Sequence, residues 1–282
     1  MSITVTGATG HLGRLIVESL LRRGVPSDQI TALGRNVAKA TDLSDRGVAV
    51  VPVEYDDVES LRRAFADTDA LMFVSGSETG KRVRQHRNVV SAAKEVGVGL
   101  IAYTSISNAD SSTMMLAAEH EATEHDITNS GLPHIFLRNS WYLENYTSQL
   151  PTYLEHGITG AAGDGKVSAA TRADFAEAAA AALTTGSHAN QVYELGGPPF
   201  TMTELAAEIS RQTGKRITYT DLPVDKYIEF LVAAGTPQSA AELIADGDRG
   251  VARGYLHVEG NDLERLIGRP PTSFADASRA AL

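Results

Sequence analysis

The chain has 282 residues, 43% of them hydrophobic, which suits one large α/β domain or a domain with an added lobe. It contains no cysteine, which excludes disulfides, thiolate metal sites and a cysteine nucleophile, and its formal net charge of −10 argues against nonspecific nucleic-acid binding. No apolar run approaches the roughly 20 residues that span a bilayer, and the first strand leaves no room for a signal peptide. We therefore expect a soluble, cytoplasmic protein.

The N-terminal stretch predicts a phosphate-binding turn. Residues 3–6 form a β-branched run typical of a buried strand, and Gly7, Gly10 and Gly13 follow at once. The first glycine lets the chain reverse, the second lets the backbone approach a pyrophosphate, and the third lets helix and strand pack closely. The helix that begins in this turn and ends near Gly24 would then direct its free N–H groups toward the anion.

Strand and helix patterns alternate along the rest of the chain, as in a parallel sheet covered on both faces. The predicted strands are 30–33, 49–53, 70–74, 100–104, 135–137 and 192–195. The predicted helices are 37–43, 61–65, 83–96, 116–129, 174–183 and 201–213, followed by less regular helices near 225–234 and 239–245. We predict an α/β fold, a Rossmann-like doubly wound parallel sheet with a smaller C-terminal substrate lobe.

The residue after the second strand favours NADPH over NADH. In this fold an acidic residue there would bind the ribose hydroxyls of NAD, whereas an arginine suits a 2′-phosphate. The sequence has Arg35, after Gly34, with no carboxylate next to it. A guanidinium can hold a phosphate with two parallel hydrogen bonds, while a solvated loop arginine is the alternative. Residues 1–150 are accordingly predicted to form the NADP-binding domain, and 151–282 the remaining sheet elements and the lobe.

Polar residues follow the third and fourth strands, at the edge of the sheet where ligands bind. Asp56 is placed to meet the adenine amino group, with a helix N-cap as the alternative. Ser75, Gly76 and Ser77 follow the fourth strand and are predicted to contact the cofactor. No histidine–carboxylate spacing indicates a metal site.

Several segments together resemble the NmrA-like atypical short-chain dehydrogenase/reductases, closest to the bacterial NADPH:quinone oxidoreductase and triphenylmethane reductase subgroup. The segments are VTGATGHLG, LGRN, QHRNVVSAAKEVGV, AYTS, LRNSWYLENY and AAGDGKVSAATRADFAEAAA, with LIGRPPTS near the end. The resemblance covers nearly the whole chain. It implies bound NADPH and a substrate cleft between the sheet domain and the lobe.

The resemblance also implies roles for individual residues. Phosphate contacts are expected from the turn and the 2′-phosphate contact from Arg35, while residues after the fifth and sixth strands would line the nicotinamide and substrate side. Thr171 and Arg172 are expected at the lobe boundary. The remaining residues carried over by motif position are Gly7, Thr9, Gly10, His11, Leu12, Gly13, Thr104, Ser105, Asn139, Trp141 and Tyr142.

The wider superfamily reduces carbonyls with a tyrosine and a lysine four residues later, and residues 116–125 contain neither. An ordinary ketone would yield a basic alkoxide that needs an acid within hydrogen-bond reach. A quinone yields a delocalised phenolate, and a triarylmethyl cation yields a neutral product, so neither needs a strong acid. This points to a planar, electron-poor aromatic acceptor, positioned against the cofactor.

No catalytic residue is assigned from sequence, and the candidates for assistance are Tyr103, Ser105, His120 and Tyr142. Strand alternation favours core packing for Tyr103. Trp141 and Tyr142 could stack on a planar substrate or simply pack. His120 could supply a proton, although an exposed helix histidine is the favoured interpretation. His86 and Asn88 are expected to hold a loop.

The sequence leaves two other functions open. NmrA-like proteins include regulators that bind dinucleotide without turnover, and the missing tyrosine and lysine fit such a redox sensor equally well. A tailoring enzyme acting on a polycyclic aromatic metabolite would present the same site. The sequence leaves monomer and homodimer open.

Overall fold

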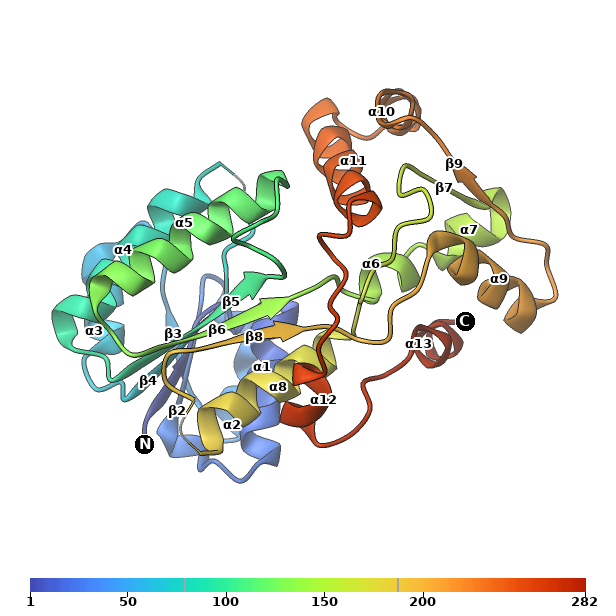
Figure 1. Ribbon diagram of the computed structural model, residues 1–282. Helices are drawn as coiled ribbons and strands as arrows, with labels where there is room; N and C mark the ends of the chain where they lie inside the picture. Colours follow the sequence, from blue (N-terminus) through green and yellow to red (C-terminus); the bar gives the residue numbers. More distant parts are fainter. Residues whose placement is uncertain (79, 187) are drawn as a thin grey trace.

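A seven-stranded parallel sheet forms the centre of the larger part of the molecule (Figure 1). The computed structural model describes residues 1–282 except Thr79 and Ser187. The strands lie in the order β3-β2-β1-β4-β5-β6-β8, and each neighbouring pair is parallel. Their bounds are β1 (Ile3–Val5), β2 (Ile30–Gly34), β3 (Ala49–Pro52), β4 (Ala70–Phe73), β5 (Leu100–Ile106), β6 (His134–Asn139) and β8 (Gln191–Leu195). The predicted Rossmann-like α/β fold is confirmed.

Helices cover both faces of this sheet (Figure 1). One face carries α3 (Val58–Phe65), α4 (Arg82–Val96) and α5 (Met115–Ser130), and the other carries α1 (His11–Arg22), α2 (Thr41–Asp45), α8 (Arg172–Thr184) and α12 (Asp262–Ile267). Because both faces are covered, the central strands are apolar at successive positions, as in β4, where all four residues are buried. Their apolar runs are what made the strands recognisable in the sequence.

Helix α8 is rich in alanine and is buried on nearly every side. It lies between α1 and α12, and its small side chains let these helices approach closely. The side chain of Thr171 caps its N-terminus by accepting a hydrogen bond from the Asp174 N–H group at 3.1 Å. The cap and this packing fix the start of α8, where Arg172 lies next to the lobe and pairs with Glu144.

The C-terminal lobe lies beyond the carboxyl ends of the strands (Figure 1). The chain leaves the sheet after β6, returns for α8 and β8, leaves again, returns for α12 and leaves a last time. Strands β7 and β9 pair in parallel as a small second sheet. The lobe elements are α6 (Glu144–Thr147), α7 (Leu150–His156), β7 (Ile158–Gly160), α9 (Met202–Thr213), β9 (Tyr219–Asp221), α10 (Val224–Ala233), α11 (Gln238–Ala252) and α13 (Phe274–Ala281).

Two predicted helices need correction, and several short elements were not predicted. The helix expected over 37–43 is a 3₁₀ turn, Val37–Ala40, followed by α2. The helix expected near 239–245 continues to Ala252, because two glycines that interrupt its apolar pattern are sites of close packing: a Cβ on Gly250 would lie 2.3 Å from the sulfur of Met114. Elements α6, α7, β7, β9, α12 and α13 were not predicted, since each has at most eight residues.

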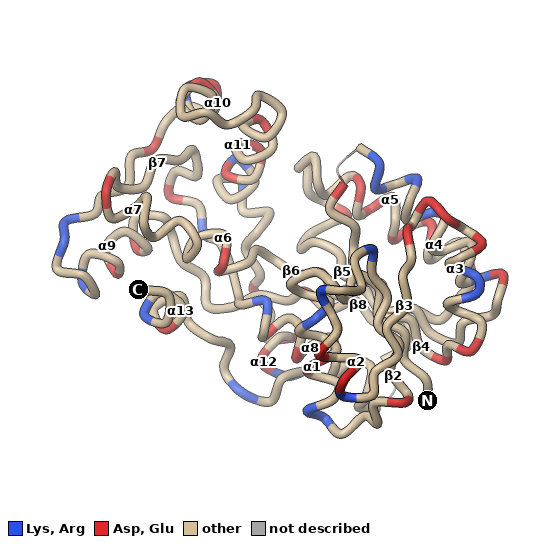
Figure 2. The backbone as a smooth tube through the Cα atoms, turned by 180° about the vertical axis from the view of Figure 1, so that it is seen from behind, with Lys and Arg blue, Asp and Glu red and all other residues tan. Residues whose placement is uncertain are grey.

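Charged residues lie mostly on helices and loops, with both signs intermixed, and the sheet is largely uncharged (Figure 2). Within the described part of the chain, no helix combines the length and the apolar character needed to cross a membrane.

Candidate functional site

A cleft of about 940 Å³ lies along the carboxyl edge of the sheet. It includes the crevice between β1 and β4, where the strand order reverses and ligands bind in this class of fold. Its volume is in the upper part of the range of small-molecule sites. The predicted site residues that line it are Gly7, Thr9, Gly10, His11, Leu12, Gly13, Arg35, Asp56, Ser75, Gly76, Ser77, Ser105, His120, Asn139, Trp141 and Tyr142.

The glycine turn at one end of the cleft has the geometry that its spacing predicts. Gly7 has a φ of 62°, which favours glycine. A Cβ on Gly13 would lie 2.4 Å from the Gly7 carbonyl oxygen, so only glycine lets α1 start this close to the end of β1. Gly10 is the N-cap residue of α1, and its side chain is absent where an anion would approach.

Basic side chains surround the part of the cleft after β2. Arg35 is 63% exposed there, and its Nη1 donates to a carboxylate oxygen of Glu78 at 2.6 Å. Lys81 donates to the other oxygen of Glu78 at 3.2 Å, and Lys39 lines the same region. The two lysines were missed in the sequence because neither follows a strand directly. Glu78 thus neutralises part of the positive charge that would otherwise attract a phosphate.

Asp56 lines the cleft, but it does not cap the next helix. The cap is Asp57, whose carboxylate accepts a hydrogen bond from the Ser60 N–H group at 3.0 Å. Hydrogen bonds from Gln85 and Arg84 lower the pKa of the Asp56 carboxyl and keep it ionised. Asp56 is therefore an acceptor beside the cleft, as its predicted contact with an amino group requires.

The opposite end of the cleft holds buried polar atoms that lack partners in the described part of the chain. Ser105 Oγ and Asn139 Oδ1 are both buried without a hydrogen bond. An unsatisfied buried polar atom costs about 1–3 kcal/mol, which a bound ligand would recover. These two atoms are therefore suited to receive a polar group in the cleft.

Aromatic side chains border the same end. Trp141 and Tyr142 follow β6, and the Arg172 guanidinium carbon lies 4.3 Å from the centre of the Tyr142 ring. The Arg172 guanidinium pairs with Glu144 at 3.4 Å, which ties α8 to α6. Trp141 packs against α11, where its ring lies 3.5 Å from the position of a Cβ on Gly247. These rings thus join the sheet to the lobe.

Three predicted residues do not line the cleft. Thr104 is buried, and its hydroxyl accepts a hydrogen bond from the Ser75 N–H group at 2.9 Å, so it positions the loop after β4. Thr171 caps α8. Tyr103 is fully buried between the sheet and the helices α4 and α5, in agreement with the favoured packing interpretation.

Two histidines near the cleft, His86 and His120, lie in one buried cluster. The expectation that His120 is exposed is wrong: it is 7% exposed, and its Nδ1 is 2.7 Å from the Tyr103 hydroxyl. His86 holds a loop as expected, since its Nε2 accepts a hydrogen bond from the Gly76 N–H group at 2.9 Å. The amide of Asn88 likewise donates to the Tyr55 carbonyl. Sequence neighbours could not indicate this burial, because the hydroxyl that His120 meets comes from β5.

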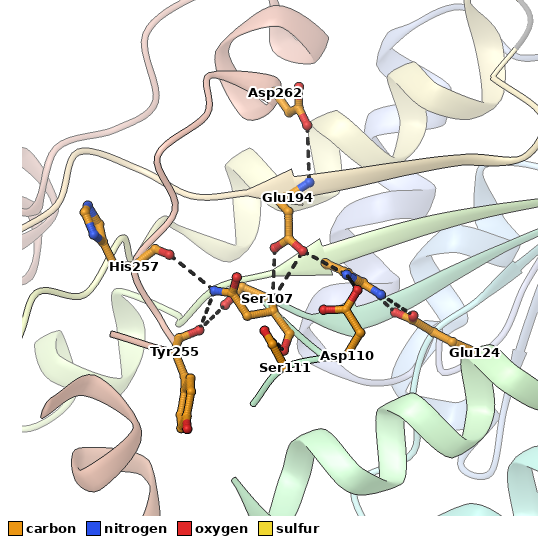
Figure 3. A network of polar contacts seen from close by, with 10 residues as sticks. Ser107, Asp110, Ser111, Glu124, Glu194, Tyr255, His257 and Asp262 are labelled. Carbon is orange, nitrogen blue, oxygen red and sulfur yellow. Dashed lines mark hydrogen bonds and ion pairs between the residues drawn. The ribbon is translucent and has the colours of Figure 1, made fainter. Parts of the chain in front are cut away.

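A charged network joins the end of the sheet to α5 and to the loop after β5 (Figure 3). Arg138, next to Asn139 in β6, pairs with Glu124 at 2.7 Å, Asp110 at 3.0 Å and Glu194 at 3.1 Å. These carboxylates belong to α5, to the loop after β5 and to β8. Burial alone would lower the pKa of Arg138, but the hydrogen bonds that it donates to these carboxylates, together with their negative charge, raise this pKa above its ordinary value, so the guanidinium stays charged.

The same network reaches Tyr255 and His257, which follow α11 (Figure 3), through Asn108. Its side-chain amide donates to the carbonyl oxygen of Tyr255 at 2.8 Å and to that of His257 at 3.3 Å. Its backbone N–H group donates to Glu194 at 3.1 Å, with a φ of 53° that asparagine tolerates. The segment after α11 is thereby fastened to the end of the sheet.

The sheet, its glycine turn and the cleft across the strand reversal define a dinucleotide-binding protein of the Rossmann class. Residues 1–248 match the NmrA-like family, and the chain belongs to that family. This confirms the resemblance found in the sequence.

Individual relatives match over nearly the whole chain. The chain is 45% identical to quinone oxidoreductase 2 of Escherichia coli over 277 residues, 98% of this chain and 96% of the relative. A crystal structure of the Escherichia coli NADPH-dependent quinone oxidoreductase complexed with NADPH matches with a TM-score of 0.96 and 44% identity, covering 99% of each chain. The Citrobacter sp. triphenylmethane reductase complexed with NADP(H) matches with a TM-score of 0.94 and 38% identity, covering 100% of each chain.

Proposed function

We propose that this protein is an NADPH-dependent reductase that transfers a hydride to a quinone or a similar conjugated aromatic acceptor. The observation that carries the proposal is one continuous cleft with a phosphate-binding turn at one end and unpartnered polar atoms beside aromatic rings at the other. The relatives named NADPH-dependent quinone oxidoreductase and triphenylmethane reductase support it over the full length of the chain.

The residues of the cleft fit NADPH along its length. The turn from Gly7 to Gly13 and the N-terminus of α1 would hold the pyrophosphate. Arg35, with Lys39 and Lys81, would hold the 2′-phosphate, and Glu78 would give up part of its pairing with them. Asp56 would accept from the adenine amino group.

The orphaned atoms at the other end fit the nicotinamide carboxamide. Its amide group could pair with Ser105 Oγ and Asn139 Oδ1, which have no other partner in the described chain. When bound, NADPH supplies a hydride from its nicotinamide ring. The protein's own contribution is to hold a planar acceptor against that ring, with Trp141 and Tyr142 as the bordering surfaces.

The acceptor class follows from what α5 lacks. This helix contains neither tyrosine nor lysine, so it supplies no Tyr–Lys pair to protonate an alkoxide. A quinone or a triarylmethyl cation needs no strong acid, because its reduced form is a delocalised phenolate or a neutral molecule. We also propose a cytoplasmic location, where NADPH and such acceptors meet.

The test is NADPH oxidation with a panel of acceptors: a benzoquinone, a naphthoquinone, a cationic triarylmethane dye and a simple ketone. We expect saturable turnover of at least one conjugated acceptor and none of the ketone. Tight NADPH binding by calorimetry with no turnover of any acceptor would instead favour a redox-sensing regulator. Equal turnover of the ketone would contradict the proposed acceptor class.

A further inference from the structure

His120 has one ring nitrogen in a buried hydrogen bond and the other available to the cleft. Its Nδ1 lies 2.7 Å from the hydroxyl oxygen of Tyr103. Its Nε2 makes no hydrogen bond to any described residue. This atom is also not among the fully buried atoms that lack a partner, and His120 lines the cleft, so Nε2 is accessible from the cleft. Which nitrogen carries the proton decides what His120 can offer a ligand.

The position of that proton follows from the hydrogen bonds of a neighbouring histidine, His86, which also lies beside Tyr103. The N–H group of Gly76 donates to His86 Nε2 at 2.9 Å, so this nitrogen is the acceptor of the His86 ring. Burial lowers the pKa of His86 to about 3, so the ring is neutral and carries its proton on Nδ1. That Nδ1–H group donates to the Thr123 hydroxyl at 2.9 Å.

The next step fixes the Tyr103 hydroxyl. Thr123 donates its own proton to the carbonyl of Glu119 at 2.9 Å. His86 Nδ1, 3.5 Å from the Tyr103 oxygen, is protonated and cannot accept. The Tyr103 hydroxyl is fully buried, and of the two ring nitrogens within hydrogen-bond distance in the described structure, His120 Nδ1 at 2.7 Å is the one that can accept its proton. His120 therefore carries its proton on Nε2, the nitrogen available to the cleft.

Electrostatics keep this arrangement neutral. Burial lowers the pKa of His120 well below its ordinary value, and the positive charge of Arg82 lowers it further. Arg82 itself pairs with Glu119 at 2.9 Å, and Glu124 is paired with Arg138, so neither carboxylate is free to favour an imidazolium. Burial also raises the pKa of Tyr103, so the hydroxyl does not ionise.

We propose that the Nε2–H group of His120 is the hydrogen-bond donor to the oxygen of the bound acceptor, and that Tyr103 is the positioning residue that holds the imidazole in this form. The inference rests on the proposed quinone reduction and assigns the group that takes the place of the missing Tyr–Lys pair. Alternation along β5 puts Ser105 on the same face of the sheet as Tyr103, so the donor lies on the side of the unpartnered Ser105 hydroxyl.

The chemical step balances without any ionisation of the protein. The quinone gains a hydride, which is two electrons and one proton, from the cofactor, and becomes the monoanion of the hydroquinone. The Nε2–H group donates a hydrogen bond to the oxygen where negative charge develops, and a proton from water completes the product. His120 remains neutral throughout and acts as a hydrogen-bond donor that is already in place when the negative charge develops.

Two variants of His120 separate the donor from the shape of the side chain. His120→Met removes the donor, whereas His120→Gln places an amide N–H group near the position of Nε2. We expect His120→Met to lower kcat/KM for a quinone by at least about tenfold, the effect of one lost hydrogen bond, and His120→Gln to restore part of it. A cationic triarylmethane dye, whose product carries no charged oxygen, should be affected by less than about twofold in both variants, and NADPH affinity by calorimetry should not change.

The role of Tyr103 has its own readout. In the unaltered protein, the imidazole nitrogen shifts of His120 measured by NMR should show a neutral Nε2–H ring that does not titrate between about pH 5 and 8. Tyr103→Phe should produce a mixture of the two neutral forms and lower kcat for the quinone more than it changes KM. Tyr153→Phe, a tyrosine of the lobe outside the cleft, is the matched control and should leave both readouts unchanged.

The outcomes separate this inference from the proposed function. If the unaltered protein does not reduce quinones with NADPH, the proposed function fails. If it does, while His120→Met retains full quinone activity or the NMR spectra show the Nδ1–H form, the inference alone is overturned. If His120→Met loses as much activity with the dye as with the quinone, the inference is also overturned, because His120 would then act only through packing.

Discussion

The two ends of the cleft are built by different means. At the glycine turn, the site is formed by backbone conformation and exposed cations, and three of the residues that line it are glycines, which have no side chain. At the lobe end, buried side chains from β5, α5, β6 and α8 meet, and their positions depend on partners far apart in the chain. The first end therefore needs only a local motif, whereas the second can be altered by changes outside the cleft.

The largest effect is expected from breaking the turn. Gly13→Ala would place a Cβ 2.4 Å from the Gly7 carbonyl oxygen and 2.6 Å from its carbon, so the backbone itself must move. We expect NADPH binding to fall by at least about 100-fold, as measured by calorimetry, because the N–H groups of the turn would lose their alignment. Gly260→Ala, where a Cβ meets nothing within 4 Å, should bind normally. Normal binding by Gly13→Ala would contradict the role of the turn.

The lobe end should be most sensitive to Arg138. Arg138→Met leaves the buried carboxylate of Glu124, 9% exposed, without its partner (Figure 3). We expect unfolding in urea to show a loss of about 3–5 kcal/mol, the usual cost of breaking a buried ion pair. Arg87→Met removes the pair with Asp126, in which the arginine is 63% exposed, and should cost at most about 1 kcal/mol. Similar losses in both variants would show that burial of the Arg138 network does not matter.

The buried histidines beside the cleft also make stability depend on pH. Burial lowers the pKa of His86 to about 3 in the folded protein, whereas the unfolded chain keeps the ordinary pKa of about 6.5. Between these values the unfolded state binds the extra proton, so stability falls as the pH falls. Each such histidine contributes a slope of about 1.4 kcal/mol per pH unit. Urea unfolding from about pH 6.5 to 4 should show a smaller slope for His86→Gln; an unchanged slope would mean that His86 is already protonated in the fold.

The exposed cations of the turn end should give the smallest effect and the clearest selectivity. Arg35→Asp places a negative charge where the 2′-phosphate is proposed to bind, so NADPH affinity should fall by about tenfold or more while NADH affinity changes little. Glu78→Gln removes the competing carboxylate and should strengthen NADPH binding by about two- to threefold. Calorimetry with both cofactors measures this, and equal losses for NADPH and NADH in Arg35→Asp would remove Arg35 from the phosphate site.

This contrast also explains how much the sequence could predict. The strands of the main sheet and the turn were predictable because apolar runs and glycine spacing are local signals. Arg35 and Asp56 were predictable as cleft residues because each follows a strand directly. The domain boundary placed near residue 150 remains a prediction.

The rest depends on contacts that no local pattern records. His120 appeared exposed because two glutamates flank it, yet Tyr103 from β5 covers its ring. Lys39 and Lys81 both reach the cleft only through the fold, where Lys81 also donates to Glu78. The glycines of α11 look like helix breakers, but they make room for Trp141 and Met114.

The repeated passage of the chain between sheet and lobe has a consequence for its synthesis. The sheet lacks its last strand until residue 195 has left the ribosome, so β6 would present an open edge while the first part of the lobe is already made. Helix α12 then covers α8 from still later in the chain. A premature stop in the last third would thus leave a nascent chain with a sheet surface uncovered, a target for chaperones, and not a smaller working enzyme.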